Sequence, residues 1–150
     1  MRNLQAHRKT IWWVVALVLL TSVWAFFAHE FSDTRTLEGS DDSATVEVAF
    51  EQQRSGVWVN VSGKVARLLP DDNKGARHQR FILELESGHT LMVAHNIDLV
   101  VRVPLVLGDM VELRGQYEWN HKGGVVHWTH HDPAGKMQGG WIDHKSQRYR

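Results

Sequence analysis

The sequence predicts a mainly β domain behind a single apolar N-terminal helix. After Val57, apolar and polar residues alternate in several short runs, as in strands that bury one face. Gly63 lies inside the first run, and a glycine within a strand indicates a bulge or a sharp bend that curls a sheet. About five such runs, with a connector between the third and fourth, are typical of a small OB-like antiparallel barrel. A β-sandwich built from the same strands is the alternative.

The apolar segment 11–28 (IWWVVALVLLTSVWAFFA) contains no charged residue and is close to the length of ~20 residues that spans a bilayer. Basic residues precede this segment and acidic residues follow it, so the positive-inside rule places residues 1–10 in the cytoplasm. We therefore expect a single-pass signal-anchor in the inner (cytoplasmic) membrane, with the C-terminal domain extracytoplasmic, in a periplasm where one exists. A cleaved signal peptide is the alternative.

Residues 29–43 are polar, acidic and rich in turn formers, which predicts a linker to an OB-like domain over 44–150. At the start of this domain, Ala44–Arg54 has apolar residues at helical spacing, although Thr45–Phe50 also alternates as a strand would. The first three strands are expected over Val57–Val65, Arg80–Glu86 and Thr90–His95, and Leu68-Leu69-Pro70 is expected to end the first of them. A connector is expected over Asn96–Leu107. The Gly139–Ile142 segment near the end is expected to fold back onto the domain.

A hairpin is predicted from Met110–Asn120 and Val125–Asp132, joined by a link with two glycines, His121–Gly124. This link places Glu118 opposite His127. Side chains alternate between faces, so the prediction gives one core face and one polar face. The core face holds Leu113, Gly115, Tyr117, Trp119, Val126, Trp128, His130 and Asp132. The polar face holds Arg114, Gln116, Glu118, Asn120, His127, Thr129 and His131.

Composition excludes several chemistries. There is no cysteine, which removes disulfides, thiol nucleophiles and cysteine-ligated zinc. The ten histidines gather toward the C-terminal half, and histidine is a common metal ligand and a proton carrier near neutral pH. Nucleic acid is an unexpected partner, because formal net charge is zero and the part after the apolar segment is slightly acidic.

The histidine-rich hairpin allows a divalent metal site for Zn, Mn or Fe. Its ligands would be His95, Glu118, His127 and His131, drawn from neighbouring strands because one strand face cannot supply three. With Asp132 or His130 as base, such a site would suit a metal-dependent hydrolase resembling a phosphodiesterase. In the alternative interpretation, Glu118 and His127 form only a cross-strand pair and Trp128 packs in the core.

A binding site for an envelope protein or a small anionic ligand, on the polar face of the hairpin rich in histidine and tryptophan, is the leading hypothesis. In the Arg77–Arg80 segment, His78 and Arg80 could orient an anion, since arginine makes bidentate contacts to phosphate and carboxylate. In the His95–Asp98 segment, a histidine beside an aspartate could form a general-base pair. The candidate ligand-binding residues are His78, Arg80, His95, Asn96, Asp98, Glu118, Asn120 and Trp128.

Several long polar segments make the chain from Leu68 onward resemble a bacterial family, domain of unknown function 3465. They are LLPDDNKGARHQRFIL (68–83), AHNIDL (94–99), YEWN (117–120), KGGVVHWTHHDP (122–133) and GWIDH (140–144). The resemblance implies one known type of domain behind an N-terminal membrane segment. It implies no particular activity.

Overall fold

The computed structural model describes residues 41–150, which fall in one unit and are mainly β. The predicted cytoplasmic N-terminus, the signal-anchor and most of the linker lie outside the described residues. The helix is α2 (Ser43–Glu51) and the strands are β1 (Val57–Asp72), β2 (His78–Glu84), β3 (Thr90–Asn96), β4 (Met110–Glu118), β5 (Val125–His127), β6 (Trp141–His144) and β7 (Gln147–Tyr149). Within residues 41–150, no helix is both long enough and apolar enough to span a bilayer.

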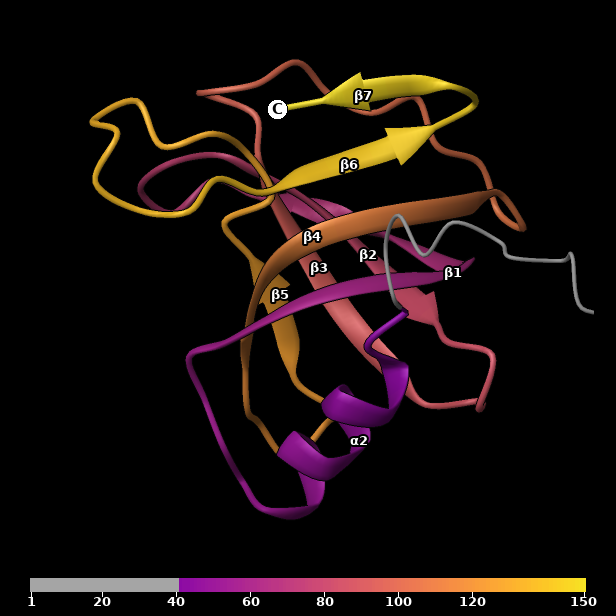
Figure 1. Cartoon of the computed structure of the whole chain (residues 1–150). Helices are drawn as coiled ribbons and strands as arrows, with labels where there is room; N and C mark the ends of the chain where they lie inside the picture. Colours follow the sequence, from indigo (N-terminus) through magenta and orange to yellow (C-terminus); the bar gives the residue numbers. More distant parts are fainter. Residues whose placement is uncertain (1–40) are drawn as a thin grey trace, which may run out of the picture. The chain divides into compact units, whose positions relative to one another are not determined.

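Five strands form a closed ring of hydrogen bonds in the order β1-β2-β3-β5-β4, with β4 pairing again with β1. All of these pairs are antiparallel except β3 with β5. The tail extends the sheet, because β6 pairs with β4 and β7 pairs with β6. Figure 1 shows the β6–β7 hairpin at one end of the ring and α2 at the other. The prediction that Gly139–Ile142 folds back is confirmed.

Strand β1 serves two partners because it bends in the middle. Its first half, Val57–Lys64, pairs with β4, and its second half, from Lys64 onward, pairs with β2. A Cβ atom on Gly63 would lie 2.5 Å from the Glu84 carbonyl oxygen, so only glycine lets the two chains cross this closely. The bulge itself falls after Val65. The predicted end at Leu68–Pro70 was wrong, because β1 continues to Asp72.

The helix prediction at the start of the domain is confirmed, and the strand alternative over Thr45–Phe50 is wrong. Val46 and Ala49 are spaced by three residues and both are buried in the core. Asp42 fixes the start of α2, because its backbone N–H donates to the Asn60 carbonyl (2.7 Å) and its carboxylate accepts from the Asn60 N–H (2.9 Å). Helix α2 therefore packs on β1 over the end of the ring.

The core fills the inside of the ring with the inward side chains of every strand. Burial alternates strictly along β2 and β3, which confirms the period-two prediction for both. The largest fully buried apolar side chains are Tyr117, Phe81, Leu83, Leu91, Leu113 and Ile142. The connector after β3 has no helix or strand, and its Val103 and Leu105 reach the same core.

The predicted hairpin is present, but its register is shifted by two residues. Glu118 lies opposite Val125 and Gln116 lies opposite His127. A shift of two residues preserves the faces of paired strands, so Tyr117 and Val126 point inward as predicted. The link packs tightly, because a Cβ on Gly124 would lie 2.2 Å from the Tyr117 ring. This contact and the positive φ of 94° require glycine there.

The second strand of the hairpin was predicted too long. It ends at His127 because Trp128 adopts a left-handed conformation with a φ of 54°. The chain leaves the strand at this residue, and Thr129 is fully buried although the pattern placed it outward. Strand β6 then takes the place beside β4, and Gly140 passes so close that a Cβ would lie 2.0 Å from the Trp128 carbonyl oxygen.

Candidate functional site

The outward faces of β2, β3 and the hairpin bring together five of the candidate residues. Each lies next to a buried residue that faces the core, and each is itself partly accessible. The five are His78, Arg80, Asn96, Glu118 and His127. The residues of β2 and β3 are neighbours through strand pairing, since His78 is opposite Asn96 and Arg80 is opposite Ala94. We call this surface, on the outward side of β2, β3 and β5, the outer face.

Glu118 and His127 are neighbours on the outer face despite the shifted register. The His127 Nε2 atom lies 3.6 Å from a Glu118 carboxylate oxygen, which is too long for a hydrogen bond. This nitrogen is buried and has no hydrogen-bond partner among the described residues. Burial lowers the pKa of His127, while the negative charge of Glu118 acts in the opposite direction. Burial therefore favours the neutral form of this ring, although a carboxylate lies beside it.

His95 does not belong to the outer face, because it points into the core and is 0 % exposed. Its Nε2 lies 3.4 Å from the Val101 carbonyl oxygen and its Nδ1 lies 2.9 Å from the Thr129 hydroxyl. A carbonyl can only accept, so in the neutral ring Nε2 donates and Nδ1 accepts from the hydroxyl. Burial lowers the pKa of His95 to about 4. The ring therefore fastens the connector and the hairpin to β3.

The two candidate bases, Asp132 and His130, are both engaged by their own loop. The Asp132 carboxylate accepts backbone N–H groups from Ala134, Lys136 and Met137, and these hydrogen bonds lower its pKa. His130 is buried, and its Nδ1 donates to the carbonyl of the next residue at 2.7 Å. These contacts shape the turn after β5.

The remaining candidates have structural partners or lie apart. The Asp98 carboxylate accepts the backbone N–H of Arg77 (2.7 Å) and forms an ion pair with its guanidinium (2.7 Å); both contacts lower the pKa of Asp98 and tie the connector to the start of β2. The Asn120 side chain accepts the backbone N–H groups of Lys122 (2.8 Å) and Gly124 (3.2 Å), and so shapes the hairpin link. Trp128 is partly exposed, and its ring lies near those of His127 (6.2 Å between centroids) and His130 (5.4 Å).

The four predicted metal ligands are not brought together. His95 faces the core, Glu118 and His127 face outward, and His131 is exposed beyond the break at Trp128. Across residues 41–150, no group of three or more histidine and acidic side chains has a geometry that could hold a metal ion.

A groove on the outer face, which the sequence analysis missed, adjoins the hairpin link. Its volume is about 320 Å³. Arg67, Leu69, Ile82, Thr90, Met92, Asn120, Lys122 and Gly124 line it. The floor follows the strand pairing, since Ile82 lies opposite Arg67 on β1 and opposite Met92 on β3. A signal for it was present, because Ile82 and Met92 are apolar residues at outward positions of their strands.

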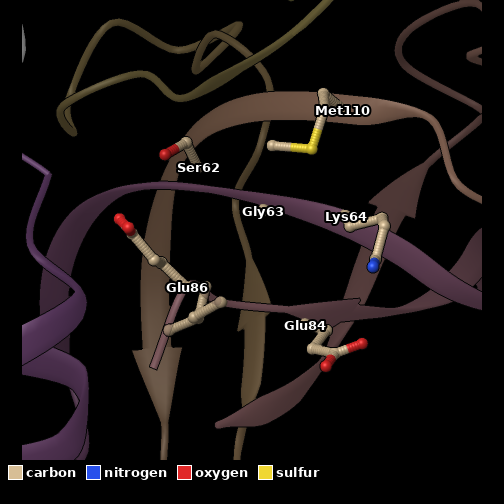
Figure 2. Close-up of a pocket in the computed structure, with 7 residues that line it drawn as sticks. Ser62, Gly63, Lys64, Glu84, Glu86 and Met110 are labelled. Atoms are coloured by element: carbon tan, nitrogen blue, oxygen red, sulfur yellow. The ribbon is translucent and has the colours of Figure 1, made fainter. Parts of the chain in front are cut away.

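A second cavity, of about 330 Å³, lies at the bend of β1. Figure 2 shows Met110 over Gly63, with Lys64 and Glu84 on one side of Gly63 and Ser62 and Glu86 on the other. This cavity is lined by residues of both charges, and Lys64 is the register partner of Glu84. The groove at the hairpin link has a different character, with no acidic residue among its lining residues.

A comparison with known families matches residues 27–150 to the family described as protein of unknown function (DUF3465). The chain belongs to this family. The match begins well before Leu68, so membership covers α2 and β1 as well as the segments that carried the resemblance. No curated protein matches the chain.

Proposed function

We propose that this DUF3465 member is a binding domain that takes its ligand or envelope partner on the outer face. We further propose that residues 44–150 form an OB-like barrel, held outside the cytoplasm by a signal-anchor over 11–28. The ring order, with β3 and β5 parallel and α2 over one end, supports the barrel. In OB-type barrels the face of strands 2 and 3 and the adjoining loops bind ligands.

The observation that carries the proposal is the groove, an apolar floor on the solvent side of a sheet. Leu69, Ile82 and Met92 remain partly exposed there, on the side of the sheet that faces solvent. Covering the accessible part of such side chains would stabilise a complex by roughly 1 kcal/mol each. The polar groups beside the groove, His127 and Glu118 among them, would provide orientation, as in most ligand sites.

Tryptophan fluorescence and thermal unfolding of the full-length protein in nanodiscs test this function. Envelope extracts, small anions and divalent ions are each added to the wild type, to His127→Ala and to the control His121→Ala, which alters an exposed link residue. We expect a response to one of these additions that His127→Ala weakens and His121→Ala retains. Unchanged fluorescence and stability against all three would remove the support for a binding domain.

The alternative is the divalent-metal-dependent hydrolase. Its support is the proximity of His127 and Glu118, whose side chains lie 3.6 Å apart. A third ligand would have to move toward them. Elemental analysis of protein purified without chelators separates the two functions, because stoichiometric zinc, manganese or iron would favour the hydrolase. Metal-free protein that gains no stability from added ions would reject it.

A further inference from the structure

We infer that the groove beside the hairpin link binds a small amphipathic anion, a soluble molecule with an apolar body and one phosphate or carboxylate group. This inference rests on the proposed binding function and adds the chemistry of the ligand. It draws on three properties of the groove: its floor, the charges at its rim and the rigidity of its wall.

The floor selects an apolar body. Ile82 and Met92 are register partners on adjacent strands, and Val125 on β5 continues the same line across the sheet. Leu69 adds a further apolar side chain from β1. Ordinary alternation would place polar side chains on this solvent-facing side. A volume of about 320 Å³ is at the small end of the range for small-molecule sites, which suits a single ring or a short chain.

The rim selects an anionic group. Arg67 on β1 and Lys122 in the hairpin link both line the groove, and neither makes an ion pair with any residue in the range 41–150. The groove itself contains no acidic side chain. Two carboxylates flank the groove without lining it: Glu84 lies opposite Thr90 and lines the other cavity, and Glu118 lies opposite Val125. Arginine and lysine together recognise phosphate and carboxylate through charge-assisted hydrogen bonds.

The wall is fixed before any ligand arrives. The Asn120 side chain holds the link through two backbone N–H groups, and His89 Nε2 lies 2.9 Å from the Gly123 carbonyl oxygen. The Tyr117 hydroxyl donates to the same carbonyl from the core side at 3.3 Å. A wall held from three sides keeps Lys122 near the floor, and a preformed site avoids the entropic cost of ordering a loop on binding.

Phenyl phosphate is the test probe, because it is water-soluble and combines one ring with one anionic group. Isothermal titration with the full-length protein in nanodiscs, corrected with empty nanodiscs, should give a Kd at least tenfold lower than for inorganic phosphate or phenol, since each of these satisfies only half of the groove. Similar binding of inorganic phosphate would overturn the amphipathic assignment. Similar binding of phenol would overturn the anionic one.

Substitutions locate the bound probe. Lys122→Gln and Arg67→Gln should each raise the Kd roughly fivefold or more by removing a charge-assisted contact. Ile82→Gln should raise it similarly by making the floor polar. Lys136→Gln, the same charge change at another exposed loop, should leave the Kd unchanged. Thermal unfolding checks that each variant is folded, and Lys122→Gln alters only an exposed side chain.

The outcomes separate this inference from the function on which it rests. A Kd that ignores Lys122→Gln, Arg67→Gln and Ile82→Gln, or no measurable binding of phenyl phosphate, would overturn the groove assignment. If another addition still produced a response that depends on His127, the binding function would stand without this ligand class. If a protein from the envelope extract bound in its place, the small-molecule assignment would fail.

Discussion

Acid should destabilise the domain because of one core histidine. His95 is fully buried with a pKa of about 4, against an ordinary value of 6.5 that applies once the chain unfolds. As the pH falls below 6.5, the unfolded chain takes up a proton that the folded chain does not. The folded state therefore loses stability progressively between pH 6.5 and pH 4. Above pH 6.5 the folded state keeps the whole of the stability that depends on an unprotonated His95.

The magnitude follows from the two pKa values. Lowering the pH from 7 to 5 should reduce the free energy of unfolding by about 2 kcal/mol through His95, and the full loss below pH 4 is about 3 kcal/mol. For a domain of this size, a loss of about 2 kcal/mol lowers Tm by roughly 10 °C. The lowered pKa of His127 also makes the free energy of unfolding fall as the pH falls.

The assay compares the pH dependence of unfolding in two variants. His95→Gln removes the titrating ring, so we expect a less stable protein at pH 7 that loses clearly less stability between pH 7 and pH 5 than the wild type. His121→Gln, an exposed histidine in the hairpin link, should retain the wild-type slope. Equal slopes for His95→Gln and the wild type would refute the reasoning, as would an NMR titration of native His95 with a midpoint near 6.5.

Three further predictions concern packing, the connector and the outer face. Gly124→Ala should destabilise by roughly 1–3 kcal/mol more than Gly88→Ala in chemical denaturation, because both have positive φ but only Gly124 faces a ring within 2.2 Å; equal losses would contradict the packing argument. Gln79→Ala should lower the free energy of unfolding by about 2–4 kcal/mol and speed amide exchange in the connector. The reason is that the Gln79 amide forms hydrogen bonds with both the buried backbone N–H and the C=O of Val103. Unchanged exchange would show that this anchor is unimportant. Glu118→Gln should lower the pKa of His127 further in an NMR titration, because the carboxylate charge raises it; a rise would reverse our assignment.

The sequence predicted the strands well because each one buries a single face. The alternation around Phe81 and Val93 depends only on which side of the sheet meets water, and this is a local property. The helix at Val46 and Ala49 was the preferred prediction, because a helix that buries one face also leaves a local pattern of apolar residues. The bend at Gly63 was predicted from a glycine in a strand, although the position of the bulge after Val65 was not.

The candidate site was predicted only in part. Glu118 and His127 were expected to be neighbours, and they are, because a shift of two residues leaves both on the same face. His95 and Thr129 were expected to be accessible, but both are buried. His95 is at an inward position of β3, and the left-handed conformation of Trp128 turns Thr129 toward it. No periodicity in the sequence indicates that single change of conformation.

The sequence by itself determined the five strands that form the ring, the helix before them and the need for glycine in the hairpin link, because these follow from local patterns of burial and backbone freedom. The two tail strands, β6 and β7, were not predicted. Tertiary structure alone decided which strands close the ring, where β5 ends and which outward side chains share the groove. Arg67, Ile82 and Lys122 are far apart in the sequence, and only the pairing of β1, β2 and β3 beside the hairpin link brings them to one surface.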